Sequence, residues 1–195
     1  GHEAYRFVDF LAAAGQRYWQ VLPLGPTSYG DSPYQSFSAF AGNPYYIDLQ
    51  LLTEQGLLQP GEAAAPDWGL RPDWVDYAKL YANRFLVLKK AWSRSRWEQD
   101  ADFSDFCRKN RTWLEDYALF MAVKAAQGQA GLADWPNALR CREPEAIAAA
   151  KAELAGSIDY YKAVQFFFYT QWSALKAYAN AKGIRLVGDI PIYVS

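Results

Sequence analysis

Residues 18–52 read YWQVLPLGPTSYGDSPYQSFSAFAGNPYYIDLQLL, a hydrophobic strand that runs into a long loop. The strand is expected over residues 18–24 and should end at Gly25-Pro26, because both residue types are unfavourable inside a strand. The aromatic residues that follow are Tyr29, Tyr34, Phe37, Phe40, Tyr45 and Tyr46. Rings beside small polar residues suit a ligand with apolar faces and hydroxyl edges, such as a sugar. Since loops on a rigid scaffold often carry function, this loop is the first candidate site.

A helix and a glycine precede this strand. Ala4, Phe7, Val8 and Leu11 fall at helical spacing and form one apolar stripe. Gly15 stands where the end of a helix favours a left-handed residue. The order is therefore helix, glycine, strand and polar loop.

The same order recurs near the other end of the chain. Gly183 separates a helical stripe from a second hydrophobic strand, expected over residues 184–190. The stripe consists of Val164, Phe168, Trp172, Leu175 and Ala179. This is the repeating step of a parallel α/β fold, so we expect 18–24 and 184–190 to be neighbouring parallel strands. Two steps fit a barrel or a doubly wound sheet equally well.

The residues between these two steps have a different character. Apolar spacing predicts helices over residues 80–97 and 112–127, and Pro144 between two acidic residues predicts the start of another. Residues 59–79 read as irregular. We therefore expect three parts: an N-terminal helix, strand and loop (1–49), a mostly helical insertion (50–157), and a final helix and strand (158–195).

The strongest candidate for a sugar site is the segment Tyr29-Gly30-Asp31-Ser32-Pro33-Tyr34. Gly30 can take a positive φ and Pro33 fixes its own φ, so the pair would hold the polar side chains in one layout. Tyrosine rings can stack on the face of a glucose unit, while Asp31 and Ser32 can hydrogen-bond its hydroxyls. The alternative is that Asp31 and Ser32 only make local bonds to the backbone of a turn.

Asp189 is the second candidate, at the end of the strand expected over residues 184–190. A carboxylate near the C-terminal end of a barrel strand faces the mouth where active sites lie. The alternative is a buried acid whose hydrogen bonds order the strand end. The two roles are compatible.

Composition excludes several classes of function. The net charge is −1 with no basic stripe, which argues against nucleic-acid binding. No apolar run approaches the roughly 20 residues that a membrane helix needs. The single histidine, His2, cannot build a zinc site, and Cys107 and Cys141 have no CxxC partners. We expect no metal, no cofactor, no membrane partner and a cytoplasmic location.

Three segments carry a resemblance to a known family. They are GHEAYRFVDFLAAAG at 1–15, the stretch at 18–52 quoted above, and YKAVQFFFYTQWSALKAYANAKGIRLVGDIPIYV at 161–194. In their residues, order and spacing they resemble amylomaltase, the 4-α-glucanotransferase or disproportionating enzyme of glycoside hydrolase family 77. The middle of the chain is also similar, so the resemblance covers nearly the whole sequence.

The resemblance implies a partial (β/α)8 TIM barrel with a mostly helical insertion between barrel strands. It implies transfer of α-1,4-glucan segments between maltooligosaccharides or starch-like glucans by a retaining double displacement, which needs two carboxylates. Positions matching Ser32 and Tyr34 contact the glucan at the cleavage centre in that family. The position matching Tyr29 lies at a second glucan site, and Asp189 matches an aspartate near the donor subsite.

The resemblance assigns neither the nucleophile nor the acid/base to a residue of this chain. We therefore expect the chain to be a fragment that lacks both and transfers no glucan alone. Substrate binding is expected at Tyr29, Asp31, Ser32, Tyr34 and Asp189. Two alternatives stay open at this point: a non-catalytic glucan-binding module, and a hydrolase of the α-amylase clan, because transfer and hydrolysis differ in how water is excluded from the intermediate.

Overall fold

The computed structural model describes residues 1–27, 30–71, 73–191 and 193–194. The chain forms two compact units. The first combines Gly1–Arg96 with Gln165–Ser195, and the second is Trp97–Val164. Each unit is described by itself below.

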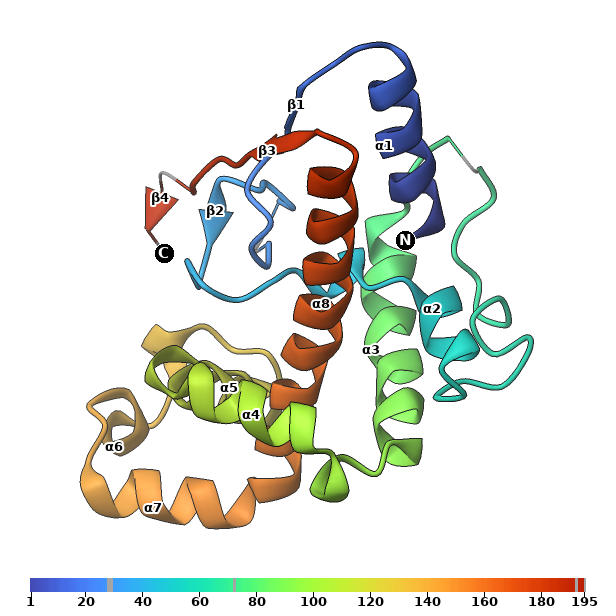
Figure 1. Cartoon of the computed structure of the whole chain (residues 1–195). Coiled ribbons are helices and arrows are strands. Elements are labelled where there is room, and N and C mark those ends of the chain that lie inside the picture. The colour runs from blue at the N-terminus through green and yellow to red at the C-terminus, as the bar shows by residue number, and fades with distance from the viewer. Residues whose placement is uncertain (28–29, 72, 192, 195) are drawn as a thin grey trace. The chain divides into compact units, whose positions relative to one another are not determined.

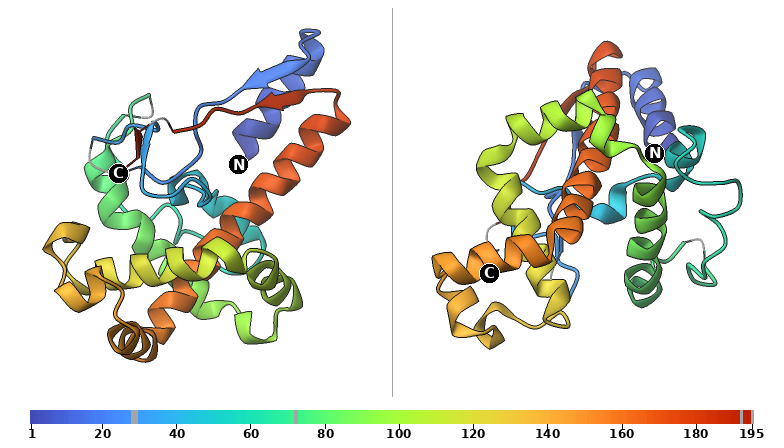
Figure 2. Two further views of the ribbon diagram at one scale, coloured as in Figure 1. Left: turned by 90° about the vertical axis from the view of Figure 1, so that its left-hand side faces the viewer. Right: turned by 90° about the horizontal axis from the view of Figure 1, so that it is seen from below.

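The first unit contains a parallel strand pair, as the sequence predicts. β1 (Tyr18–Gln20) pairs with β3 (Arg185–Val187), and Trp19 lies opposite Leu186. Figure 2 shows the two strands running side by side. The Val21 amide extends the pairing by one bond to the carbonyl of Val187 at 2.9 Å. The pair and its flanking helices establish an α/β fold.

Both strands are shorter than the predicted ranges 18–24 and 184–190. Pro23 has no amide hydrogen to offer a ladder. On the other strand, the Ile190 amide donates to the side chain of Asp189 at 2.8 Å rather than to a neighbouring strand. The hydrophobic residues at these ends therefore continue as irregular chain.

A second parallel pair was not predicted. β2 (Gln35–Ser36) lies in the aromatic loop and pairs with β4 (Tyr193–Val194), so the loop and the end of the chain meet a second time (Figure 1). Two-residue strands leave no periodic signal for sequence reasoning to detect.

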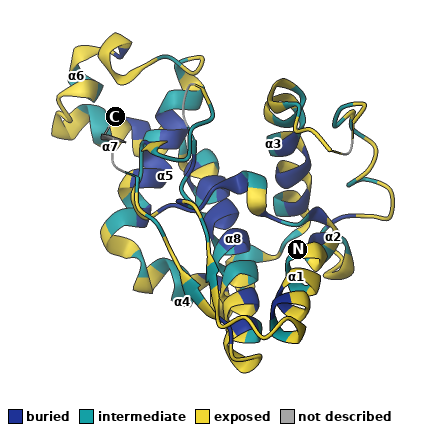
Figure 3. Ribbon diagram, turned by 90° about the horizontal axis from the view of Figure 1, so that it is seen from above, coloured by how far each residue is buried: buried dark blue, intermediate teal, exposed yellow. Residues whose placement is uncertain are grey.

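Helices α1 (His2–Ala13) and α8 (Ala155–Ala181) support the strands of the first unit (Figure 1). Their shared core is made of Val8, Leu11, Leu175, Ala179 and Ile184. Figure 3 shows buried residues along one side of α8. Gly15 and Gly183 end the two helices at φ +70° and +78°, which confirms the predicted helix–glycine–strand order.

Three short or medium elements follow the aromatic loop within the same unit. They are the 3-10 turn η1 (Pro44–Tyr46), α2 (Leu49–Glu54) and α3 (Tyr77–Arg94). Asp48 caps α2 by accepting from the Gln50 amide at 2.7 Å. The stretch before α3 is irregular in its described residues, as expected.

The second unit is helical in its described residues. Its elements are η2 (Trp97–Gln99), α4 (Ala101–Lys109), α5 (Arg111–Ala126), η3 (Leu132–Asp134), α6 (Asn137–Arg140), α7 (Pro144–Glu153) and the first ten residues of α8. Pro144 occupies the first turn of α7, as predicted. Leu114, Ala118 and Val164 form part of its buried interior. Among the described residues, no helix combines the length and apolarity needed to cross a membrane.

Candidate functional site

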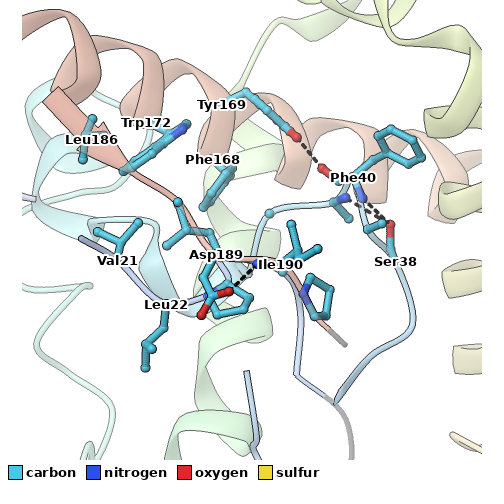
Figure 4. Close-up of a pocket in the computed structure, with 18 of the residues that line it drawn as sticks. Val21, Leu22, Ser38, Phe40, Phe168, Tyr169, Trp172, Leu186, Asp189 and Ile190 are labelled. Carbon is cyan, nitrogen blue, oxygen red and sulfur yellow. Dashed lines mark hydrogen bonds between the residues drawn. The ribbon is translucent and has the colours of Figure 1, made fainter. Parts of the chain in front are cut away.

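A pocket of about 320 Å³ lies beyond the carboxyl ends of β1 and β3 (Figure 4). Its lining comes from the chain after each strand, from the end of the aromatic loop and from α8. The lining residues include Leu22, Gly25, Phe40, Gly42, Phe168, Tyr169, Trp172, Lys176, Asp189 and Ile190. The carboxyl ends of parallel strands are where α/β folds place their ligands, so the pocket is the candidate site.

Asp189 lines this pocket and is joined to the aromatic loop. Its Oδ2 accepts a hydrogen bond from the Tyr34 hydroxyl at 3.0 Å, and its Oδ1 accepts from the Ile190 amide at 2.8 Å. The bond to the carboxylate raises the pKa of Tyr34, because the phenol must stay protonated to donate. The structure thus brings together two of the residues that the sequence singles out.

The other predicted residues of the loop make local contacts. The Ser32 hydroxyl accepts from the Tyr34 amide at 3.3 Å, and Asp31 accepts from the Thr27 hydroxyl at 3.5 Å. Gly30 takes φ +87° and Asp31 takes φ +55°, so the chain reverses through two left-handed residues. Of the predicted site residues that the structure describes, Asp189 lines the pocket, whereas Asp31, Ser32 and Tyr34 do not. Tyr29 lies outside the described residues.

Tyr45, further along the aromatic loop, is half-buried. Burial raises the pKa of the Tyr45 phenol to about 12, and the charge of Asp31 adds to the shift. The Tyr45 ring also packs against Phe85 of α3, with centroids 6.3 Å apart. Tyr45 therefore packs on α3, and it is not among the residues lining the pocket.

Sequence reasoning missed the contribution of α8 to the pocket. Phe168, Tyr169, Trp172 and Lys176 all line it, and Figure 4 shows the first three on the helix above Asp189. Phe168 and Trp172 belong to the apolar stripe that predicts this helix, and a core role is the usual meaning of such a stripe. Lys176 follows Trp172 by four residues and so lies on the same face of the helix. This one charged residue is the only sign in the sequence that the face is not wholly part of a core.

A buried arginine fixes the chain that leaves the loop. The Arg84 guanidinium donates to three backbone carbonyls: Pro44 at 3.1 Å, Tyr45 at 2.6 Å, and Ile47. Burial lowers the pKa of Arg84 to about 10, and the charge of Asp48 opposes that shift. A planar fork with several donors can satisfy three carbonyls at once, so α3 holds η1 through this one side chain.

The side chains around the pocket are mainly apolar, several of them aromatic, with few charged groups. Within the described ranges, no group of three or more histidine, cysteine or acidic residues is placed to hold a metal ion. The pocket instead offers aromatic faces, one carboxylate and a lysine at its edge. These groups can stack on sugar rings and hydrogen-bond hydroxyls.

Comparison with known proteins identifies the family of this chain. A family model described as 4-alpha-glucanotransferase matches residues 1–195. The chain belongs to this family. It is 49% identical to the 4-alpha-glucanotransferase of Thermus thermophilus over 199 residues and 45% identical to that of Clostridium butyricum over 195 residues. All of this chain is covered, against 39% and 40% of those two proteins.

The fold comparison gives the same relationship. The amylomaltase of Streptococcus agalactiae, solved in complex with acarbose, matches with a TM-score of 0.93 and 46% identity. The match covers all of this chain and 40% of that one. The chain therefore spans about two fifths of the length of the relatives it matches.

Proposed function

We propose that this chain supplies part of the glucan-binding site of a 4-α-glucanotransferase. The observation that carries the proposal is the Tyr34–Asp189 hydrogen bond, at a pocket beyond the ends of two parallel strands. Family membership and the close fold match support the reaction class. The substrates are α-1,4-linked maltooligosaccharides or starch-like glucans.

The reaction that we propose is a retaining transfer. One carboxylate attacks the anomeric carbon while an acid protonates the leaving 4-oxygen, which gives a glycosyl-enzyme intermediate. The 4-hydroxyl of an acceptor glucan then loses its proton to the same acid/base group and displaces the enzyme carboxylate. We assign neither of these two roles to a residue of this chain; Tyr34 and Asp189 bind and orient the sugar.

The finer architecture belongs to the same proposal. We propose that β1 and β3 are two strands of a (β/α)8 TIM barrel, with residues 50–157 as a mostly helical insertion between barrel steps. The parallel pairing and the helix before each strand support this arrangement. We further propose that Asp31 and Ser32 bind glucan hydroxyls together with Tyr29, Tyr34 and Asp189, and that the protein works in the cytoplasm without a cofactor, on glucans rather than on nucleic acid or membranes.

A chimera tests the proposed function. Residues 1–195 would replace the matching two fifths of the Streptococcus agalactiae amylomaltase, and products from maltotriose would be separated by chromatography. We expect longer glucans and free glucose, with transfer strongly reduced by Asp189→Asn. A folded chimera that binds acarbose but only hydrolyses would favour the hydrolase alternative, and one that neither binds nor reacts would refute the proposal.

A further inference from the structure

Gln165 of α8 makes two hydrogen bonds to a single residue at the end of the aromatic loop. Its side chain is fully buried, its Oε1 accepts from the Gly42 amide at 2.7 Å, and its Nε2 donates to the Gly42 carbonyl at 3.0 Å. One amide side chain thus satisfies both backbone groups of one residue, as a neighbouring strand would. Removing either bond would leave a buried backbone group unpaired.

The same helix also constrains this segment sterically. The Gly42 Cα faces the ring of Phe168, so closely that a Cβ on Gly42 would lie 2.0 Å from a ring carbon. The Tyr169 hydroxyl donates to the carbonyl of Phe40 (Figure 4). Three side chains of α8, at positions 165, 168 and 169, therefore fix residues 40–42.

Residues 40–42 form one wall of the pocket, and Asp189 belongs to the lining as well. The loop that carries Tyr34 closes next to them, where the Asn43 amide donates to the Leu24 carbonyl at 2.8 Å. We propose that Gln165 is a positioning residue for glucan binding: it holds residues 40–42, one wall of the pocket, at the distance from Asp189 that the bound glucan requires. This inference rests on the proposed function.

The chain offers a matched control for this role. Gln171, six residues further along α8, accepts from the Asp48 amide at 2.7 Å and donates to the Asp48 carbonyl at 3.0 Å. The chemistry is the same, but Asp48 is not a lining residue of the pocket. A general effect of weakening an amide bridge should appear at both glutamines, and an effect on glucan binding only at Gln165.

The decisive variant is Gln165→Glu. A protonated glutamic acid keeps both bonds, because its hydroxyl donates and its carbonyl oxygen accepts. An ionised glutamate has no hydrogen to donate, so its bond to the Gly42 carbonyl would be lost. Burial raises the pKa of a carboxyl group in such a position, because the charged form is poorly solvated there. The variant should therefore gain a titration that Gln165 cannot have. Gln165→Met, which makes neither bond and does not titrate, controls for the loss of the bridge alone.

The experiment uses the chimera and compares each variant with the Gln165 protein at pH 5 and pH 8, below the melting temperature of every variant. We expect Gln165→Glu to keep most of its kcat/KM on maltotriose at pH 5 and to lose roughly tenfold more at pH 8, mainly through KM. Gln171→Glu should show no such pH-dependent ratio, and Gln165→Met should be impaired equally at both pH values.

A second measurement does not depend on glucan transfer. Amide hydrogen exchange of residues 40–42 should accelerate in Gln165→Glu at pH 8 relative to pH 5, after correction for the intrinsic pH dependence, while residues 46–48 are unchanged. Faster exchange in an inactive chimera would refute the proposed function but keep the anchoring role. Unchanged exchange, or the same KM ratio for both glutamate variants, would overturn the inference about Gln165.

Discussion

The hydroxyl of Tyr34 donates a 3.0 Å hydrogen bond to Oδ2 of Asp189, which lies 155 positions further along the chain. The bond joins the aromatic loop after β1 to the chain after β3. Neither residue can be displaced without disturbing the other, so they form one polar unit beside the pocket.

Removing only the hydroxyl of Tyr34 tests whether this unit serves the reaction. We expect Tyr34→Phe to lower kcat/KM for glucan transfer roughly tenfold or more in the chimera, because the Asp189 carboxylate loses a charge-assisted bond that orients it. Glucose release from maltotriose measures the effect. Tyr45→Phe is the matched control, since it removes the hydroxyl of a half-buried tyrosine that packs on Phe85. Equal losses in both variants would remove Tyr34 from the site.

The ion pair between Glu62 and Arg94 should make part of the protein's stability depend on pH. Bonds from the Arg94 guanidinium and the Gln59 amide lower the pKa of Glu62 to about 2, against an ordinary value of 4.5. Its contribution is therefore fully present above pH 4.5 and is lost as the pH falls towards 2.

The variant Glu62→Gln should melt about 1–3 °C below the unmodified chain at pH 7, and the difference should shrink steadily below pH 4.5. Thermal unfolding followed by circular dichroism at several pH values measures this. The exposed Glu153 provides the control variant Glu153→Gln. A difference that stays constant down to pH 3 would contradict the assigned ion pair.

Local rules predict the α/β step and some of the residues at the candidate site. The apolar stripe and Gly15 predicted α1, and the repeat of that order at Gly183 predicted the parallel partner. These features depend on neighbouring residues, so the sequence displays them directly. The end of a strand is also a local feature, so the sequence could single out Asp189, which lines the candidate pocket.

Contacts between distant segments left no such signal. Nothing in the spacing of Tyr34 and Asp189 shows that their side chains meet, and the bridge from Gln165 to Gly42 spans 123 positions. Phe168 is part of a helical stripe that any core helix would show, yet it lines the pocket. The sequence therefore reveals which residues are suited to a site more readily than which of them come together.

The Arg84 bridge to η1 predicts a large loss of stability from a conservative change. Arg84→Lys keeps the charge, but its single ammonium nitrogen cannot take the places of both Nε and Nη2, from which the guanidinium donates, so at least one buried carbonyl is left unpaired. We expect a loss of about 2–4 kcal/mol in the free energy of unfolding, measured by urea denaturation. Arg71→Lys, at an exposed pair with Asp73, should change it far less, because solvent screens such a pair. Equal effects at the two positions would show that the carbonyl bonds contribute little.

The contact between Gly42 and Phe168 predicts that even one methyl group cannot be added there. Gly42→Ala places a Cβ against the Phe168 ring, and the buried helix leaves the ring little room to move. We expect a loss of about 1–3 kcal/mol in the free energy of unfolding, together with weaker acarbose binding, because the pocket wall must shift.

Gly156→Ala is the control: its Cβ meets no atom within 4 Å, and alanine favours the helix, so the change should be neutral or stabilising. The double variant Gly42→Ala/Phe168→Leu should regain part of the lost binding, since a smaller side chain relieves the clash. If Gly42→Ala binds acarbose as tightly as the unmodified chimera, the 40–42 segment is not a wall of the glucan site.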